Sequence, residues 1–283
     1  MPGINGLPGV RTMVQQGANV NLTPETKTYI SGLVTPISTA QKKKIDKLVK
    51  DLKTGLAITN LSDFFDVFYV LANETAELGL RNLVKRANDA TAINSPSFVA
   101  LEGFAGNGTS SYLNSNYNQN LHSVKSTLNS TSIGVYSRSN LAGNSNSVEF
   151  GARTAASSKV NMIQIFIAGA KIAQGVNNGG AGAYGNILPN SKGLVCISRN
   201  SASDTVLYKN GIYNGIDHSV STSLSEYNIF LGALNQANSA VGFSTHQISI
   251  GFIGKNIATD SQALIISNSI ESYMNSNGKG VIA

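Results

Sequence analysis

The chain has 283 residues, enough for one sizeable hydrophobic core or for one domain of roughly 200 residues with appendages. Only 13% of its residues are charged, well below the roughly 25% of a typical globular chain, and Asn, Ser, Thr and Gly take their place. The formal net charge is +6, but much of it comes from the lysines of residues 41–53, so the broad basic face of a nucleic-acid-binding domain is missing. We therefore predict no nucleic acid as a partner. The basic stretch itself has two interpretations, a docking surface for an acidic partner or a solvated helix face.

The sequence also lacks the signatures of a membrane protein and of a metalloprotein. No segment reaches about 18 consecutive apolar residues, and the N-terminus has no charged region followed by an apolar one, so we expect neither membrane insertion nor a signal peptide. Cys196, the single cysteine, lies in an apolar run and is expected to be an inert core thiol. His122, His218 and His246 lie far apart, and each is expected to be a satisfied surface or core histidine rather than a ligand. We predict no metal and no cofactor.

No catalytic constellation is evident in the sequence. Hydrolysis of a glycosidic bond needs two carboxylates that face one bond, and the C-terminal two thirds of the chain has few acidic residues. Glu149, in the run VEFGAR, is expected to be an exposed strand residue. We therefore predict no catalytic, cofactor-binding or metal-binding residues, and a protein that is not an enzyme.

Residues 1–35 are predicted to be an extended attachment arm. Glycine and proline recur between Pro2 and Gly9, and both residue types disfavour helices and strands. A segment of this composition needs a surface to lie against. We expect it to dock on a partner chain or on a symmetry-related copy; the alternative is an arm wrapped on its own domain.

Residues 36–90 are predicted to be a helical linker or attachment region. Ser38 and Gln41 have the spacing of a capping box, the apolar residues of 45–52 share one face of the helix that follows, and Gly55 is a natural stop. This helix could pack on the domain or pair with copies of itself, and we expect a homo-oligomer.

A second apolar segment follows, with the sequence DFFDVFYVLAN over residues 63–73. It is apolar on nearly every side and is therefore expected to be buried. Ser62 could cap it as a helix, whereas its Phe, Val and Tyr residues favour a strand. Both alternatives stay open from the sequence.

Residues 91–283 are predicted to form an antiparallel β-sandwich. Short runs of alternating apolar residues recur between clusters of Asn, Gly and Ser. The predicted strands are 97–101, 110–114, 132–137, 147–153, 161–168, 194–199, 205–209, 228–234 and 247–253, the last with one buried face. Asn210-Gly211 marks a type I′ hairpin turn, and Thr259 with Gln262 opens a helix over 260–275. The predicted fold class is mainly β, an antiparallel sandwich preceded by an extended N-terminal arm and one or two helices, with a short C-terminal helix.

Three segments together resemble the concanavalin A-like (laminin-G-like) jelly-roll domains over roughly residues 92–280. They are FAGNGTSSYL at 104–113, VLYKNGI at 206–212 and IGFIGKNI at 250–257, the last followed by a helix. The resemblance implies a jelly-roll sandwich, a fold in which some relatives bind Ca²⁺ or sugar. The acidic residues that could serve as ligands are scattered through the sequence, so no site residue is carried over; they are Glu149, Asp204, Asp217 and Glu226.

The segment from Phe64 to Pro96 is similar to structural proteins of tailed bacteriophages, of the fibre, decoration or receptor-binding type. The resemblance implies a non-enzymatic virion protein that is located in the virion, is attached to other virion proteins through residues 1–55 and displays its sandwich for host-surface glycans. The alternatives are a free carbohydrate-binding module or adhesin, and a glycan-degrading enzyme on the same fold. Sugar rings stack on aromatic side chains. The tyrosines available for this are Tyr112, Tyr117, Tyr136, Tyr184, Tyr213 and Tyr227.

Overall fold

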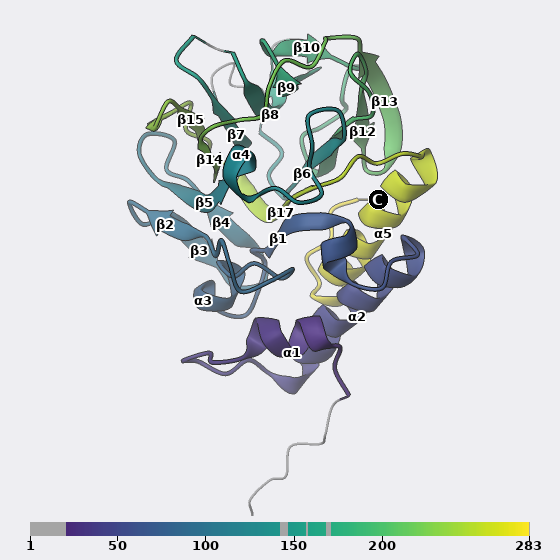
Figure 1. Ribbon diagram of the computed structural model, residues 1–283. Coiled ribbons are helices and arrows are strands. Elements are labelled where there is room, and N and C mark those ends of the chain that lie inside the picture. Colours follow the sequence, from purple (N-terminus) through teal and green to yellow (C-terminus); the bar gives the residue numbers. More distant parts are fainter. Residues whose placement is uncertain (1–20, 142–146, 157, 168–170, 283) are drawn as a thin grey trace, which may run out of the picture.

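The computed structural model describes residues 21–141, 147–156, 158–167 and 171–282. They form three layers: a layer of helices, a first β-sheet and a second β-sheet (Figure 1). The two sheets make the predicted antiparallel sandwich, and the helices cover the outer face of the first sheet. The fold class predicted from the sequence is therefore confirmed as mainly β, with a C-terminal helix.

The first sheet has eight strands in the order β13-β12-β11-β6-β17-β4-β3, with β1 beside β17. All of its pairings are antiparallel. Its strands are β1 (Phe65–Val70), β3 (Ser97–Val99), β4 (Gly103–Ala105), β6 (Thr131–Ser137), β11 (Gly193–Arg199), β12 (Thr205–Lys209), β13 (Ile212–Asp217) and β17 (Gln247–Gly254).

The second sheet has nine strands, with the path β10-β9-β8-β7-β14-β5-β2 and a short hairpin, β15–β16, beside β7. The pairing of β15 with β7 is parallel. Its strands are β2 (Thr91–Ile93), β5 (Tyr112–Asn118), β7 (Phe150–Arg153), β8 (Val160–Ile167), β9 (Lys171–Asn178), β10 (Gly182–Tyr184), β14 (Asn228–Leu231), β15 (Leu234–Gln236) and β16 (Ser239–Val241).

The helix layer consists of α1 (Pro24–Ile30), α2 (Thr39–Gly55) and α5 (Asp260–Ser276), which lie together against one side of the sandwich (Figure 1). Two single-turn helices, α3 (Ala76–Gly79) and α4 (Gln119–His122), and the 3₁₀ turn Leu61–Asp63 complete the helical elements of the described residues. The predicted caps are present. Ser38 Oγ accepts a hydrogen bond from Gln41 N at 3.0 Å, and Thr259 Oγ1 accepts one from Gln262 N at 3.2 Å.

Two hydrophobic clusters lie on opposite faces of the first sheet. Tyr136 and Cys196 point toward the helices, whereas the neighbouring Val135 and Val195 point toward the second sheet. This alternation is the ordinary pleat of a strand, here with both sides buried. The expectation that 247–253 has a single buried face is therefore wrong. In β17 a register shift between Ile248 and Ile250 accompanies the burial of both faces.

Residues 63–73 contain a strand, β1, which settles the alternative that the sequence left open. β1 pairs with β17 near the middle of the first sheet, so the segment predicted as a helical linker contributes directly to the sandwich. The helix of residues 39–54 packs on this domain, because Ile45, Val49 and Leu52 lie in the same cluster as β1 and β17. The helix is therefore part of the core.

The predicted extended arm is corrected over part of its length. Residues 24–30 form α1, with Thr23 at the N-cap and Pro24 at the first helical position. Asp46 of α2 accepts hydrogen bonds from both the backbone N–H and the hydroxyl of Thr23, at 2.6 and 2.8 Å. This helix therefore packs on its own domain. Residues 1–20 of the predicted arm lie outside the described residues.

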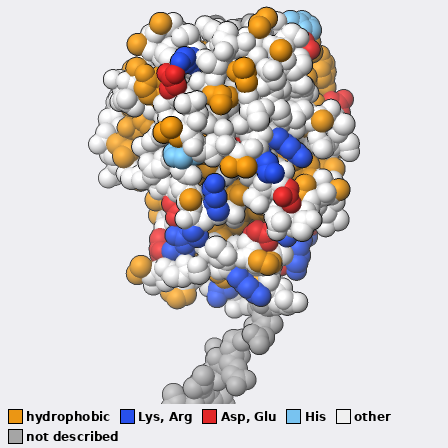
Figure 2. Space-filling view, viewed as in Figure 1, with side chains coloured by type: hydrophobic (Ala, Val, Ile, Leu, Met, Phe, Trp, Pro, Cys, Tyr) orange, Lys and Arg blue, Asp and Glu red, His pale blue; other side chains and the backbone are white. Residues whose placement is uncertain are grey.

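The lysine-rich stretch forms the exposed side of α2, and acidic neighbours neutralise much of its charge. Lys47 pairs with Asp51 at 2.5 Å and Lys50 pairs with Asp46 at 2.7 Å, while Lys53 reaches Glu25 of α1 at 2.8 Å. In Figure 2, basic and acidic side chains lie next to one another over the helix layer. These contacts fit a solvated helix face better than a docking surface for an acidic partner. None of the helices in the described ranges is long and apolar enough to cross a membrane.

Candidate functional site

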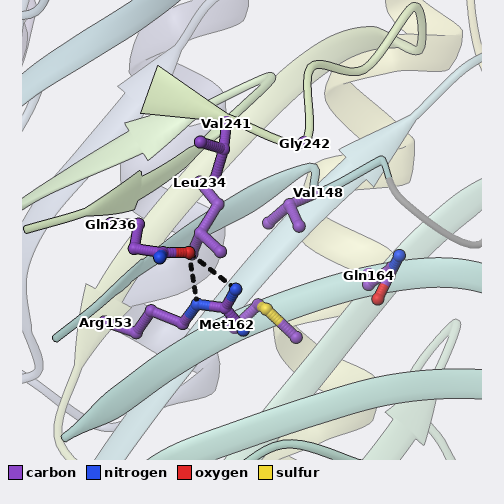
Figure 3. A pocket seen from close by; sticks show the side chains of 8 residues that line it. All are labelled: Val148, Arg153, Met162, Gln164, Leu234, Gln236, Val241 and Gly242. Carbon is purple, nitrogen blue, oxygen red and sulfur yellow. Dashed lines mark hydrogen bonds between the residues drawn. The ribbon is translucent and has the colours of Figure 1, made fainter. Parts of the chain in front are cut away.

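The outer face of the second sheet carries a pocket of about 350 Å³. It lies between the paired strands β7 and β8 on one side and the β15–β16 hairpin on the other (Figure 3). The sheet positions these side chains, because residues on one face of a strand alternate with those that point into the core. The lining residues are Val148, Arg153, Met162, Gln164, Leu234, Gln236, Val241 and Gly242.

An apolar floor underlies the pocket. Val148, Met162 and Leu234 are buried in one small cluster together with Val160, and Val241 of the hairpin packs against it. Because these side chains lie on the outer face, they belong to neither of the two main cores. They give the pocket a surface on which an apolar ring face could pack.

A guanidinium group stands at the polar side of the pocket. Arg153 donates two hydrogen bonds to Gln236 Oε1, from Nε at 3.2 Å and from Nη2 at 2.7 Å (Figure 3). β15 supplies Gln236 directly opposite Arg153 in the parallel register with β7, which fixes the pair. Among the ion pairs of the described residues, Arg153 has no carboxylate partner. Its charge is therefore available for a bound group.

A second pocket, of about 210 Å³, lies beside the first. One pair of backbone segments separates the two, joined by a 2.8 Å hydrogen bond from Val148 N to Gly242 O. Val148 and Gly242 line the first pocket, and their chain neighbours Ser147 and Phe243 line the second. The remaining lining residues are Gly108, Leu141, Ser244, Thr245 and His246.

His246 lines this second pocket, and Glu149 lies beside His246 outside the lining. Glu149 is 0% exposed and His246 only 4%, so the expectation that Glu149 is an exposed strand residue is wrong. Its Oε2 accepts the Ile165 N–H at 2.6 Å, its Oε1 accepts the Ser244 hydroxyl at 2.8 Å, and His246 Nδ1 lies 3.0 Å from the same Oε1. Among the described residues Nδ1 has no hydrogen-bond partner, so its approach to Glu149 is a close contact without a hydrogen bond.

Phe243, which lines the second pocket, belongs to a small aromatic cluster. The rings of Tyr112 and Phe230 lie 4.4 Å apart between centroids, and those of Tyr112 and Phe243 lie 6.1 Å apart. Tyr112 and Phe243 are both partly exposed, so this cluster offers ring faces at the sheet surface.

The other tyrosines considered for sugar stacking are spread over the molecule. Tyr117 and Tyr136 are fully buried, Tyr227 is partly buried, and Tyr213 is 48% exposed on β13, in the other sheet. Tyr184 lies on β10, and its side chain is outside the described ones. Among the tyrosines of the predicted set whose side chains are described, only Tyr112 lies beside a pocket of the second sheet.

The remaining histidines and acidic residues do not assemble into a site. His218 lies 2.7 Å from Asp204 on the exposed surface, and Asp217 accepts hydrogen bonds from Gln174 and Ser219. No group of three or more metal-ligand side chains occurs in the part of the chain that the structure describes. Sequence reasoning missed Arg153, Gln236 and the Glu149–His246 contact, because each pair joins segments far apart in the chain.

No protein-family model and no curated protein matches the sequence. Among solved structures, a mutant of Trypanosoma rangeli sialidase displaying trans-sialidase activity is similar over 86% of this chain and 38% of its own, with 12% identity and a TM-score of 0.51. Domain 4 of a GH43 extracellular arabinanase from Geobacillus stearothermophilus covers 72% of this chain and 98% of its own, with 17% identity and a TM-score of 0.43. The CBM40 of Ruminococcus gnavus IT-sialidase covers 50% and 84%, with 11% identity and a TM-score of 0.38.

The likeness to the sialidase supports the β-sandwich, and the chain spans 38% of the sialidase's length. It also corrects one prediction. The prediction of a protein that is not an enzyme is overturned, because a fold similar to this one also occurs in a sialidase. Nothing in these comparisons points to a bacteriophage, so the virion resemblance stays a prediction.

Proposed function

We propose that this chain binds a glycan in the pocket between β7–β8 and the β15–β16 hairpin. The observation that carries the proposal is the pairing of an apolar floor with a fixed guanidinium group, Arg153 held by Gln236. Ligand pockets typically combine a largely apolar lining with a few well-placed polar groups, at volumes of about 300–1,000 Å³. The first pocket meets both conditions.

The chemistry of a sugar ring matches this lining. A sugar presents C–H groups on its ring faces and hydroxyls around its edge. Met162 and Leu234 can pack against a ring face, while Arg153 and Gln236 can bind hydroxyl or carboxylate oxygens at the edge. The similarity to carbohydrate-binding and glycan-active domains is consistent with this use of the fold.

A glycan microarray probed with the full chain tests the proposal. We expect the wild-type chain to bind a defined subset of glycans and Arg153→Met to lose at least about tenfold in affinity, since a hydrogen bond to a charged group contributes about 1.5–3 kcal/mol. Arg86→Met is the matched control, because Arg86 pairs with Asp89 away from the pocket lining. Wild-type binding that Arg153→Met leaves unchanged, or no binding to any glycan, would refute the proposal.

The setting of this binding is proposed to be the surface of a virion. The support is the sequence resemblance of residues 64–96 to phage structural proteins and the low charge of the chain, 13% of residues. Mass spectrometry of purified particles from the source organism tests it. Peptides of this chain should co-purify with particles through a density gradient, and their absence from every particle fraction would contradict the virion setting.

A further inference from the structure

The two pockets on the second sheet are adjacent, because consecutive residues of the same two segments line them, so one ligand could occupy both. The backbone segments at 147–148 and 242–243 lie between the two pockets, with Val148 and Gly242 lining one and Ser147 and Phe243 lining the other. A ligand larger than one ring that occupies the first pocket therefore has the second pocket next to it.

The Glu149–His246 contact gives the second pocket a fixed polar group. Three interactions hold it: Ile165 N–H and the Ser244 hydroxyl bind the two carboxylate oxygens, and the His246 backbone N–H donates to Ser244 Oγ at 3.1 Å. The imidazole places Nδ1 against the carboxylate, 3.0 Å away. The other ring nitrogen is Nε2, and His246 lines the pocket.

Burying a carboxylate is costly unless it is compensated by hydrogen bonds and an opposite charge. Glu149 accepts hydrogen bonds from Ile165 N–H and from the Ser244 hydroxyl, and the His246 ring lies beside it. A ring nitrogen accepts a hydrogen bond when neutral and donates one when protonated. A sugar hydroxyl can do either in return, so it suits the site in both protonation states of the ring.

We infer that the second pocket is a further subsite for the same glycan, in which His246 Nε2 binds a hydroxyl of a second sugar ring and Phe243 offers an aromatic surface to it. Glu149 lies against the other nitrogen of that imidazole, Nδ1, at 3.0 Å. This inference rests on the proposed function of the first pocket, and it adds that the preferred ligand has at least two sugar rings.

Calorimetric titration of the full chain with size-graded sugars tests the inference. The probes are galactose, lactose and α2,3-sialyllactose in one series, and arabinose, arabinobiose and arabinotriose in the other. In the series that binds, the wild-type chain should bind the disaccharide at least about tenfold more tightly than the monosaccharide. His246→Asn, whose amide reaches only the Nδ1 position, should reduce this ratio to about two or less without changing the monosaccharide affinity. His246→Gln, whose amide reaches the Nε2 position, should restore part of the ratio.

The outcomes separate the inference from the proposed function. An unchanged size ratio in His246→Asn, or a wild-type ratio near one, overturns the second subsite while leaving the first pocket intact. Monosaccharide binding that is insensitive to Arg153→Met overturns the proposed function, and no binding in either series overturns both. Should both His246 variants melt far below the wild-type chain, the ¹⁵N signals of the His246 ring in the wild-type chain decide. These signals should shift when disaccharide is added and should not shift when monosaccharide is added. A ring signal that shifts with neither sugar overturns the subsite.

Discussion

Deleting residues 1–55 should unfold the protein rather than release an intact sandwich. The deletion removes α2, whose Ile45, Leu48, Val49 and Leu52 are each at most 1% exposed and pack against the first sheet. Full burial of such a side chain contributes about 1.5–3 kcal/mol, so these four together contribute about 6–12 kcal/mol. The entire stability of a typical domain is about 5–15 kcal/mol.

The deletion would also uncover a large aromatic surface. Phe68 stacks on Phe252 beneath the helices, and Phe65 meets both rings edge to face, with ring centroids 5.1–5.5 Å apart. The α2–α5 contact would be lost too, including the 2.7 Å hydrogen bond from Gln41 to the Tyr273 hydroxyl. We therefore expect the truncated chain to expose apolar surface and to aggregate.

Thermal unfolding followed by circular dichroism, together with binding of an apolar dye, measures this. A chain that lacks only residues 1–20 is the control, because every contact used above is made by residues beyond them. The control should unfold cooperatively, whereas the chain lacking 1–55 should show no cooperative transition and should bind the dye. A monomeric truncated chain that melts within about 5 °C of the control would refute the argument that the helix layer belongs to the core.

Three further predictions concern groups away from the pockets. Asp66→Asn should lower the free energy of unfolding by about 3 kcal/mol in urea titrations, because Asp66 accepts three backbone N–H bonds at 2.9 Å from residues 124–126, and an unchanged midpoint would contradict this. Burial raises the pKa of the Cys196 thiol, so a thiol reagent at pH 8 should react only after unfolding; rapid labelling of the native chain would count against a buried thiol. Burial lowers the pKa of Lys209 to about 8, against about 10.4 in the unfolded chain. The folded state therefore binds this proton less tightly than the unfolded state does. As a result, the free energy of unfolding falls as the pH drops from about 10.4 to 8. Lys209→Met should therefore be more stable than wild type at pH 7, by about 1–3 kcal/mol in urea titrations, and this advantage should shrink toward pH 10; a difference that is independent of pH would refute it.

Local signals in the sequence predicted the elements whose stabilising interactions are local. The capping residues Ser38 and Thr259 opened helices where expected, and Asn210-Gly211 connects β12 to β13 with both residues at positive φ, 54° and 78°. The helix α1 has such a signal as well, Thr23 followed by proline, but the glycine and proline residues that precede it outweighed it.

Other parts of the fold depend on contacts that no local pattern records. The glycine-containing run of β9, Lys171–Asn178, forms a strand because β8 and β10 pair with it on both sides. Arg153 and Gln236 are 83 residues apart and meet only because β15 pairs in parallel with β7. Glu149 was expected to face solvent, and it is buried because the segment that contains Ser244 and His246 crosses over it. The pockets could therefore not be predicted from the sequence.

The central claim is that the outer face of the second sheet binds a glycan beside Arg153, and an NMR titration tests it most directly. The measurement follows the side-chain signals of Arg153 Nε and the Gln236 amide in the ¹⁵N-labelled full chain while the best microarray glycan is added. We expect saturable shifts of these two signals and of the backbone signals of residues 234–242. Shifts confined to the helix layer or to the β13 edge of the first sheet, with Arg153 and Gln236 unmoved, would contradict it.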